Sequence, residues 1–233
     1  MHLEASDVVV QFKGLTALDH VGVRIGRGEI VGLIGPNGSG KTTLLNVISG
    51  VFPPTSGRFA LGDRHWSATT LRAAAAMGIR RTFQNIRLAA TLTALETVEV
   101  AAAWLATGDR RDIARAALEE VRFPPVGDRL AKELPYGLQR RLEIARAIAG
   151  KLEFLLLDEP TAGLNHQESQ DIVDLVCGIR DRRGCGIILI DHDLKVIFGA
   201  CERVVVLNEG KVIAAGSPAE VRSDPAVVRA YLG

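Results

Sequence analysis

Apolar residues along the chain follow two periods, one typical of strands and one typical of helices. Near the start, Val8–Val10 form a β-branched run, and Val21, Val23 and Ile25 alternate with small or polar residues. Residues 6–34 are therefore expected to form strands. Three later runs are short and almost wholly apolar, as in buried strands. They are Phe154–Leu157, Gly186–Ile190 and Arg203–Leu207.

Helical periodicity fills the stretches between these strands. Residues 41–48 follow a glycine-rich loop over 35–40, and residues 92–122 are rich in helix-forming Ala, Leu, Glu and Arg. Another helix between the first two buried strands has one apolar face. That face consists of Ile172, Leu175, Val176 and Ile179. Strands alternating with helices predict an α/β core with a mostly parallel sheet, and the helix-rich stretch predicts a helical lobe inserted at about 85–140.

The helix expected over residues 138–148 has an unusual charge at its start. Tyr136-Gly137 predicts a turn before it, which would place Arg140 and Arg141 in the first helical turn. Cations are usually favoured at the other end of a helix. A helix start that combines a glycine with added positive charge predicts an anion site.

Composition sets broad limits on the function. A chain of 233 residues is long enough for one large domain, so we expect residues 1–233 to form one. The formal net charge of +1 provides no field that would attract nucleic acid. The three scattered cysteines predict neither a metal site nor a disulfide framework. No secretory leader and no membrane-spanning run is expected, so any membrane role should depend on a partner.

The loop at 35–42 matches the pattern G-x-x-x-x-G-K-[ST] at every fixed position, between a strand and a helix. Its glycines allow consecutive N–H groups to turn inward around phosphate oxygens. Lys41 can reach the β- and γ-phosphates, and the Thr42 hydroxyl can ligate Mg²⁺. The alternative is a glycine-rich connection that binds nothing. The predicted phosphate-binding residues are Gly35, Pro36, Asn37, Gly38, Ser39, Gly40, Lys41, Thr42 and Thr43.

Two carboxylates follow the buried strand at 154–157. Ligands bind at this polar end of the strands in open α/β sheets. Asp158 can hold a metal ion through its water shell, and Glu159 is placed to polarise an attacking water. Alternatively, the acidic pair only caps the next helix. Together with the phosphate loop, the pair favours hydrolysis of a nucleotide.

Five stretches, in this order, resemble the motifs of ABC-type ATPases over essentially the whole chain. They are GPNGSGKTT (35–43), TFQ (82–84), YGLQRR (136–141), LLLDEPTAGLN (155–165) and DHD (191–193). The resemblance implies ATP and Mg²⁺ as cofactors. It also implies the ABC ATPase fold, a P-loop NTPase core with an antiparallel β lobe and an inserted helical lobe.

The resemblance implies roles for further residues. Phe12 occupies the position of the aromatic that stacks on adenine, with a strand-end core residue as the alternative. Gln84 matches the residue that senses the γ-phosphate and Mg²⁺ and faces the membrane subunit, and His192 matches the γ-phosphate histidine. Asn165 replaces the usual aspartate in the segment that crosses to the other subunit. The implied catalytic residues are Glu159, His192 and Gln84, and the implied metal ligands are Thr42, Gln84 and Asp158.

The resemblance also implies an answer to the charged helix start. In this family two ATPase domains pair head to tail, and each signature helix covers the γ-phosphate of ATP on the partner's phosphate loop. The matching residues are Pro135, Tyr136, Gly137, Leu138 and Gln139. Proline stands where the family usually has serine, and it offers neither a hydroxyl nor an N–H.

A finer resemblance is to the ATP-binding subunits of branched-chain amino acid importers. It is carried by GIRRTFQNIRL (78–88), YGLQRRLEIAR (136–146), PTAGLN (160–165) and DPAVVRAYLG (224–233). Subunits for urea or amide import and for lipopolysaccharide export share some of these stretches. Only about fifty residues separate Gln84 from Leu134, fewer than the branched-chain type often has. We therefore expect import of branched-chain or other hydrophobic amino acids, with those related systems as alternatives.

The resemblance finally implies partners and a location. They are a second ABC ATPase subunit, identical or related, two transmembrane permease subunits and, indirectly, a periplasmic or extracellular substrate-binding protein. The chain would lie peripherally on the cytoplasmic face of the inner (plasma) membrane. DNA-repair and translation ATPases share the motifs, but they need a coiled-coil insertion or a second domain. A non-hydrolysing regulatory domain would be expected to lack Glu159 or His192, and both are present.

Overall fold

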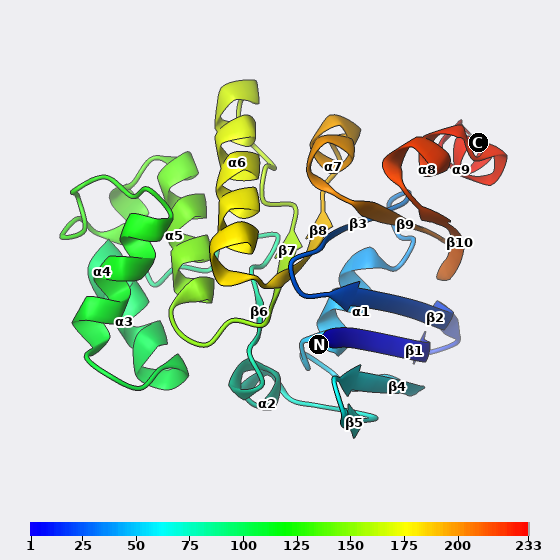
Figure 1. Cartoon of the computed structure of the whole chain (residues 1–233), viewed down its shortest axis with the longest axis horizontal. Helices are drawn as coiled ribbons and strands as arrows, with labels where there is room; N and C mark the ends of the chain where they lie inside the picture. The colour runs from blue at the N-terminus through cyan, green and yellow to red at the C-terminus, as the bar shows by residue number, and fades with distance from the viewer. Residues whose placement is uncertain (233) are drawn as a thin grey trace.

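The computed structural model describes residues 1–232, in which helices lie along the larger of two sheets and the smaller sheet lies at one side (Figure 1). The strands are β1 (His2–Phe12), β2 (Leu15–Gly26), β3 (Ile30–Ile34), β4 (Ser56–Leu61), β5 (Arg64–Trp66), β6 (Ile79–Arg81), β7 (Phe154–Asp158), β8 (Gly186–Ile190), β9 (Arg203–Asn208) and β10 (Lys211–Gly216). The helices are α1 (Lys41–Ile48), α2 (Leu71–Ala76), α3 (Ala94–Leu105), α4 (Arg110–Glu120), α5 (Tyr136–Ile148), α6 (His166–Arg183), α7 (Leu194–Ala200), α8 (Pro218–Ser223) and α9 (Pro225–Leu232).

The larger sheet has the strand order β10–β9–β3–β8–β7–β6, and every adjacent pair except β9–β10 is parallel. The smaller sheet is antiparallel, with the order β2–β1–β4–β5. The predicted α/β core with a mostly parallel sheet and an antiparallel β lobe is therefore confirmed.

The central strands are wholly apolar because both faces of the larger sheet are covered. In β7, Leu155 and Leu157 pack into the core shared with α5 and α6, whereas Phe154 and Leu156 pack into the core shared with α1 and the smaller sheet. All residues of β3, β7 and β8 are buried. Continuous apolar runs are the expected pattern for parallel strands covered on both faces.

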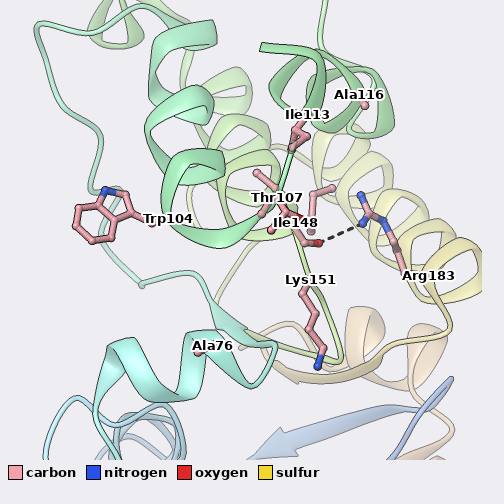
Figure 2. A pocket seen from close by; sticks show the side chains of 11 residues that line it. Ala76, Trp104, Thr107, Ile113, Ala116, Ile148, Lys151 and Arg183 are labelled. Atoms are coloured by element: carbon pink, nitrogen blue, oxygen red, sulfur yellow. Dashed lines mark hydrogen bonds between the residues drawn. The ribbon is translucent and has the colours of Figure 1, made fainter. Parts of the chain in front are cut away.

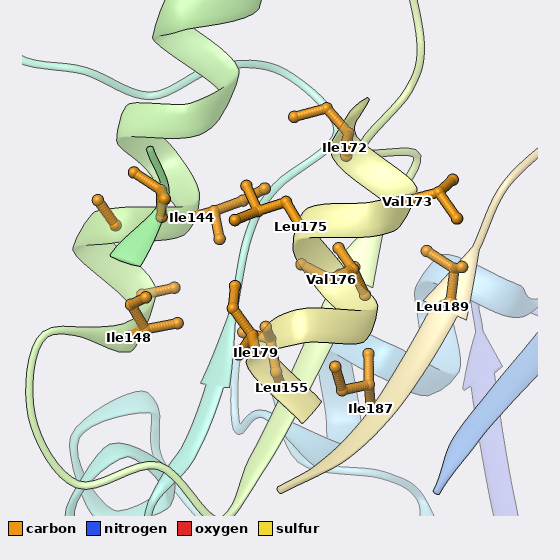
Figure 3. Packing of buried hydrophobic residues seen from close by; sticks show 14 of the residues in the cluster. Ile144, Ile148, Leu155, Ile172, Val173, Leu175, Val176, Ile179, Ile187 and Leu189 are labelled. Atoms are coloured by element: carbon orange, nitrogen blue, oxygen red, sulfur yellow. The ribbon is translucent and has the colours of Figure 1, made fainter. Parts of the chain in front are cut away.

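The inserted lobe is attached to the sheet through α5 and α6. Helices α3 and α4 pack on each other and on α5 (Figure 1). On α6, Leu175 points toward Ile144 of α5, and Val173 points toward Leu189 of β8 (Figure 3). The helix-rich stretch at 92–122 is thus two helices, separated near Gly108, where φ is +126°.

The turn predicted at Tyr136-Gly137 is wrong, because α5 already begins at Tyr136. Pro135 is its N-cap, and the Pro135 carbonyl accepts bonds from the N–H groups of Leu138 and Gln139 at 2.9 and 3.0 Å. The φ of proline is preset near helical values, so proline suits a helix start. Arg140 consequently falls in the second turn instead of the first.

Short elements with little apolar periodicity escape the sequence prediction. The strands β5 and β6 have only three residues each, and α2 is an alanine-rich helix of six residues. The positions of the two strands are fixed by their neighbours, since β6 pairs with β7 and β5 pairs with β4. Within residues 1–232, no helix combines the length and apolar character that crossing a membrane requires.

Replacing Leu175 by alanine should lower the free energy of unfolding by about 2–5 kcal/mol, because it leaves a cavity in the contact between α5 and α6. Urea denaturation followed by circular dichroism measures this change. The exposed Gln170 on the same helix is the matched control, and Gln170→Ala should stay within about 0.5 kcal/mol. Equal stability of the two variants would contradict the packing of α6.

Candidate active site

The phosphate loop joins β3 to α1 in a backbone conformation that only glycine allows. Gly35 has φ +148°, and a Cβ there would lie 2.0 Å from the carbonyl oxygen of Leu207. Gly40 has φ +106°, and its Cβ would lie 2.7 Å from the Ala17 oxygen. No side chain caps the start of α1, so its first N–H groups face outward without a helical partner. Such a helix start favours bound phosphate.

Lys41 is folded over this loop. Its Nζ donates to the carbonyl oxygens of Gly35 at 2.7 Å and of Pro36 at 2.9 Å. Burial lowers the pKa of Lys41, and the charges of Glu159 and Asp158 oppose that shift. The ammonium group is thus held above the loop by two carbonyl groups for which phosphate oxygens could substitute.

The three predicted catalytic residues meet at one carboxylate. Glu159 Oε2 accepts a hydrogen bond from Gln84 Nε2 at 2.9 Å, and His192 Nε2 lies 2.7 Å from Glu159 Oε1. Glu159 has φ +51°, a left-handed conformation that is uncommon outside glycine. Its N–H donates to the carbonyl of Ile190 at 2.9 Å, which holds this backbone against the end of β8.

The preceding residue, Asp158, offers carboxylate oxygens, which are ligands that Mg²⁺ prefers. Thr42 Oγ1 donates to Asp158 Oδ1 at 3.4 Å, and the guanidinium of Arg81 lies 3.6 Å from Oδ2. Among residues 1–232, the buried Oδ2 has no hydrogen-bond partner. Burial raises the pKa of Asp158, and Arg81 opposes the shift. Oxygen atoms of Thr42, Asp158 and Gln84 fit a Mg²⁺ ion whose remaining ligands are water and phosphate.

Lys41, Thr42, Gln84, Glu159 and His192 face one cavity of about 380 Å³, and Asp158 lies outside its lining. It is lined by Ala17, Asn37, Gly38, Gly40, Lys41, Thr42, Thr43, Gln84, Glu159 and His192. A larger cavity of about 700 Å³ lies at the base of the helical lobe, where Trp104, Ile148 and Arg183 surround it (Figure 2). No carboxylate lines the larger cavity among the described residues. The smaller cavity is therefore the candidate active site.

Phe12 lies at the end of β1, outside the lining of this cavity. Its side chain is 48% exposed and contacts Phe52 edge-on, with ring centroids 5.5 Å apart. The alternative that Phe12 is a strand-end core residue is wrong, since nearly half of it faces solvent. The exposed ring leaves the adenine-stacking role as a proposal.

The arginines of α5 do not supply the expected positive charge at the helix start. The Arg140 side chain is wholly buried on the inner face of α5. Arg141 donates to the carbonyl of Val121 at 3.1 Å and lies 3.5 Å from Asp171. This prediction is wrong because the helix begins two residues earlier than expected. Only the unpaired N–H groups and the dipole of the first turn remain for an anion.

The signature residues are exposed at the start of the stretch and half-buried from Gly137 to Gln139. Pro135 and Tyr136 are exposed, and none of residues 135–139 lines the cavity at Lys41. A Cβ placed on Gly163 would lie 3.2 Å from Tyr136 Cε1, so the ring lies directly against that glycine. Asn165 caps α6 by accepting from the Glu168 N–H at 3.0 Å.

Two features of the site were missed from the sequence. Arg81 neutralises part of the Asp158 charge, and its position just before TFQ was the only available indication. The spacing Arg140–Glu143–Arg146 places alternating charges on one helix face at i, i+3 and i+6. That regular spacing could have predicted the buried network that the structure contains.

The fold and the cavity define a nucleotide-binding ATPase built around a phosphate loop. The sequence model described as ABC transporter matches residues 18–162. The chain therefore belongs to the ABC transporter family, and it is an ATP-hydrolysing, ATP-binding subunit of that family. A second model, described as branched-chain amino acid ATP-binding cassette transporter, matches residues 211–233, of which Gly233 lies outside the described residues.

Individual relatives extend over nearly the full chain. LivG of Escherichia coli (strain K12), a high-affinity branched-chain amino acid transport ATP-binding protein, is 38% identical over 99% of this chain and 97% of its own. LptB of the same strain, a lipopolysaccharide export system ATP-binding protein, is 34% identical, also over 99% and 97% of the two chains.

Solved structures show the same arrangement. The ADP conformation of MJ1267, an ATP-binding cassette of an ABC transporter, superimposes with a TM-score of 0.91 at 29% identity, over 100% of this chain and 99% of that one. The dimeric post-hydrolysis state of the cassette MJ0796, bound to ADP and Pi, gives 0.84 at 28% identity over 93% and 98%. The predicted ABC ATPase fold is confirmed.

Replacing Glu159 by glutamine should stop turnover while ATP binding persists. The amide retains the shape that contacts Gln84 and His192, but it cannot accept a proton from water. We expect hydrolysis to fall about 10²–10⁴-fold, the usual contribution of a general base. Single-turnover hydrolysis and calorimetric ATP affinity measure the two effects. A single-turnover rate near that of the unchanged protein would rule out this role for Glu159.

Proposed function

We propose that this chain is the ATPase subunit of an importer for branched-chain or other hydrophobic amino acids. The observation that supports hydrolysis most directly is the meeting of Gln84 and His192 at the Glu159 carboxylate, beside the phosphate loop. The similarity to LivG over nearly the whole chain, with the match of residues 211–233, supports the substrate class. A role in lipopolysaccharide export or in urea or amide import is the alternative.

The proposed mechanism assigns a separate task to each group. The ring of Phe12 stacks on adenine, and residues 35–43 hold the phosphates. Thr42, Gln84 and Asp158 would hold Mg²⁺, which when bound would neutralise part of the phosphate charge. Glu159 orients the attacking water and accepts its proton, while His192 contacts the γ-phosphate. Tight positioning and electrostatic stabilisation supply most of the rate in such phosphoryl transfers.

We propose that two ATPase subunits pair so that residues 135–139 of one cover the γ-phosphate held by the other. The exposure of Pro135 and Tyr136 and the dimeric state of the similar cassette MJ0796 support this arrangement. Residues 1–233 would act as one domain, with the lobe at about 85–140 transmitting movement to two permease subunits. The subunit would lie on the cytoplasmic face of the inner membrane and respond indirectly to a substrate-binding protein.

The function is tested in the purified complex of this chain with its partner ATPase and permeases, reconstituted in vesicles. Binding protein loaded with leucine should raise ATP hydrolysis several-fold, whereas unloaded binding protein should not. Lys41→Ala is the control for the site, since it removes the cation from the β/γ-phosphates and should abolish the increase. Stimulation by urea, an amide or lipopolysaccharide, with none by leucine, would overturn the amino acid assignment.

Pro135 should weaken the composite site that uses this signature helix. A hydrogen bond to a charged group contributes about 1.5–3 kcal/mol, so the absent serine hydroxyl corresponds to about a ten- to hundred-fold effect. Pro135→Ser should therefore raise turnover or apparent ATP affinity in the assembled transporter by about tenfold. Steady-state ATPase assays beside the unchanged complex measure this.

The competing explanation is that proline only starts α5, as its N-cap position shows that it does. In that case the backbone N–H groups of the first turn suffice for the phosphate. If turnover and apparent ATP affinity of Pro135→Ser stay within about twofold of the unchanged complex, proline only starts the helix. The proposal that Pro135 weakens this composite site is then wrong.

A further inference from the structure

The segment after β6 leaves the sheet and is bound to α5. The Thr82 N–H still donates to Leu156 of β7, at 3.0 Å. From the next residue onward the partners change, since the carbonyls of Phe83 and Gln84 both accept from the Arg140 guanidinium at 3.2 Å. The backbone therefore changes its bonding partner from β7 to α5 between residues 82 and 83.

A second set of bonds holds the far end of this segment to the same helix. The Arg87 N–H donates to Glu143 Oε1 at 3.0 Å, and Arg146 donates to the Arg87 carbonyl. Residues 83–87 are thus attached to α5 at both ends. The Gln84 carbonyl is bonded to the helix, whereas the Gln84 side chain reaches Glu159 at the end of β7.

Arg140 and Glu143 form the buried centre of this attachment. Both side chains are wholly buried, and Arg140 Nη1 lies 2.9 Å from Glu143 Oε2. Burial raises the pKa of Glu143, and the Arg87 N–H and the nearby arginines oppose the shift. A buried ion pair contributes little net stability compared with an apolar replacement. However, the planar guanidinium group of Arg140 can hold several hydrogen-bond acceptors in a fixed arrangement.

The same guanidinium also contacts the start of the signature helix. Arg140 Nη2 donates to the Tyr136 hydroxyl at 3.1 Å, and the ring of Tyr136 lies against Gly163. One side chain therefore connects the surface that faces the partner's nucleotide with the backbone of Gln84. Between that surface and Glu159, the path consists of Tyr136, Arg140 and Gln84.

We propose that Arg140 is a positioning residue that makes Gln84 move with the start of α5. Displacement of the signature helix by a nucleotide on the partner subunit then changes the bond between Gln84 and Glu159 in this subunit's site. The state of one nucleotide site is passed to the other through this side chain. This inference rests on the proposed function, because it requires a nucleotide at the start of α5.

Arg140→Lys tests the proposal in the assembled complex. Lysine keeps a positive charge beside Glu143 but loses the fork that reaches both carbonyls and the Tyr136 hydroxyl. We expect kcat for ATP hydrolysis to fall about tenfold, while the ATP dissociation constant stays within twofold. Arg141→Lys is the matched control, since Arg141 faces Val121 and Asp171, and its kcat should be unchanged.

Combination with Gln84→Ala distinguishes positioning from general damage. If Arg140 acts through Gln84, Arg140→Lys should lower kcat no further once the Gln84 side chain is absent. If the loss of kcat in the double variant equals the product of the two single losses, the proposal is overturned. Tyr136→Phe keeps the ring and the buried ion pair, so it remains informative even where Arg140→Lys destabilises the fold. Its smaller loss of kcat should also disappear in the Gln84→Ala background, and a loss that persists there counts equally against the proposal.

The two levels of inference fail in different ways. Absence of Lys41-dependent ATP hydrolysis in the unchanged complex would refute the proposed function. Normal hydrolysis in the unchanged complex, with Arg140→Lys and Arg141→Lys giving equal kcat, would refute only the role of Arg140.

Discussion

The arrangement of the candidate active site depends on the hydrogen bond between Gln84 and Glu159. This bond joins an amide supported by α5 to a carboxylate supported by the sheet, across the boundary between the helical lobe and the core. The phosphate loop, Asp158 and His192 all belong to the sheet side of that boundary. A site whose two parts are held by different elements is sensitive to anything that displaces either element.

The central strands β3, β7, β8 and β9 of the larger sheet could be predicted from the sequence, whereas the edge strands β6 and β10 could not. The boundaries of α1 and β8 were predicted to the residue, and Asp158 and Glu159 were placed correctly at the end of β7. Buried parallel strands require continuous apolar runs, and the phosphate loop requires glycines at set positions. Both requirements act on residues that are close together in the sequence, so the sequence pattern allows few other structures. The resemblance to ABC ATPases then supplied Gln84 and His192, which no local pattern indicates. The structure brings both of them to Glu159.

The errors arise where distant residues decide the local conformation. Tyr136-Gly137 has turn-forming composition, yet Pro135 starts the helix there and moves Arg140 into the interior. An arginine in a helix is normally interpreted as solvated, and its burial depends on carbonyl groups more than fifty residues earlier in the chain. For Phe12 only the alternative of a core residue is wrong, because the ring is 48% exposed although its backbone pairs with Leu15 of β2.

The left-handed backbone of Glu159 gives its two carboxylate oxygens unequal neighbours. The Glu159 N–H is bound to Ile190, two residues before His192, so the histidine next to Oε1 is tied to the same short piece of chain. The Gln84 amide next to Oε2 comes from the segment that follows β6, whose backbone is bonded to α5. The two oxygens of one carboxylate are therefore held by segments that lie far apart in the sequence. A change in either segment would alter the hydrogen bonding of one oxygen and leave that of the other in place.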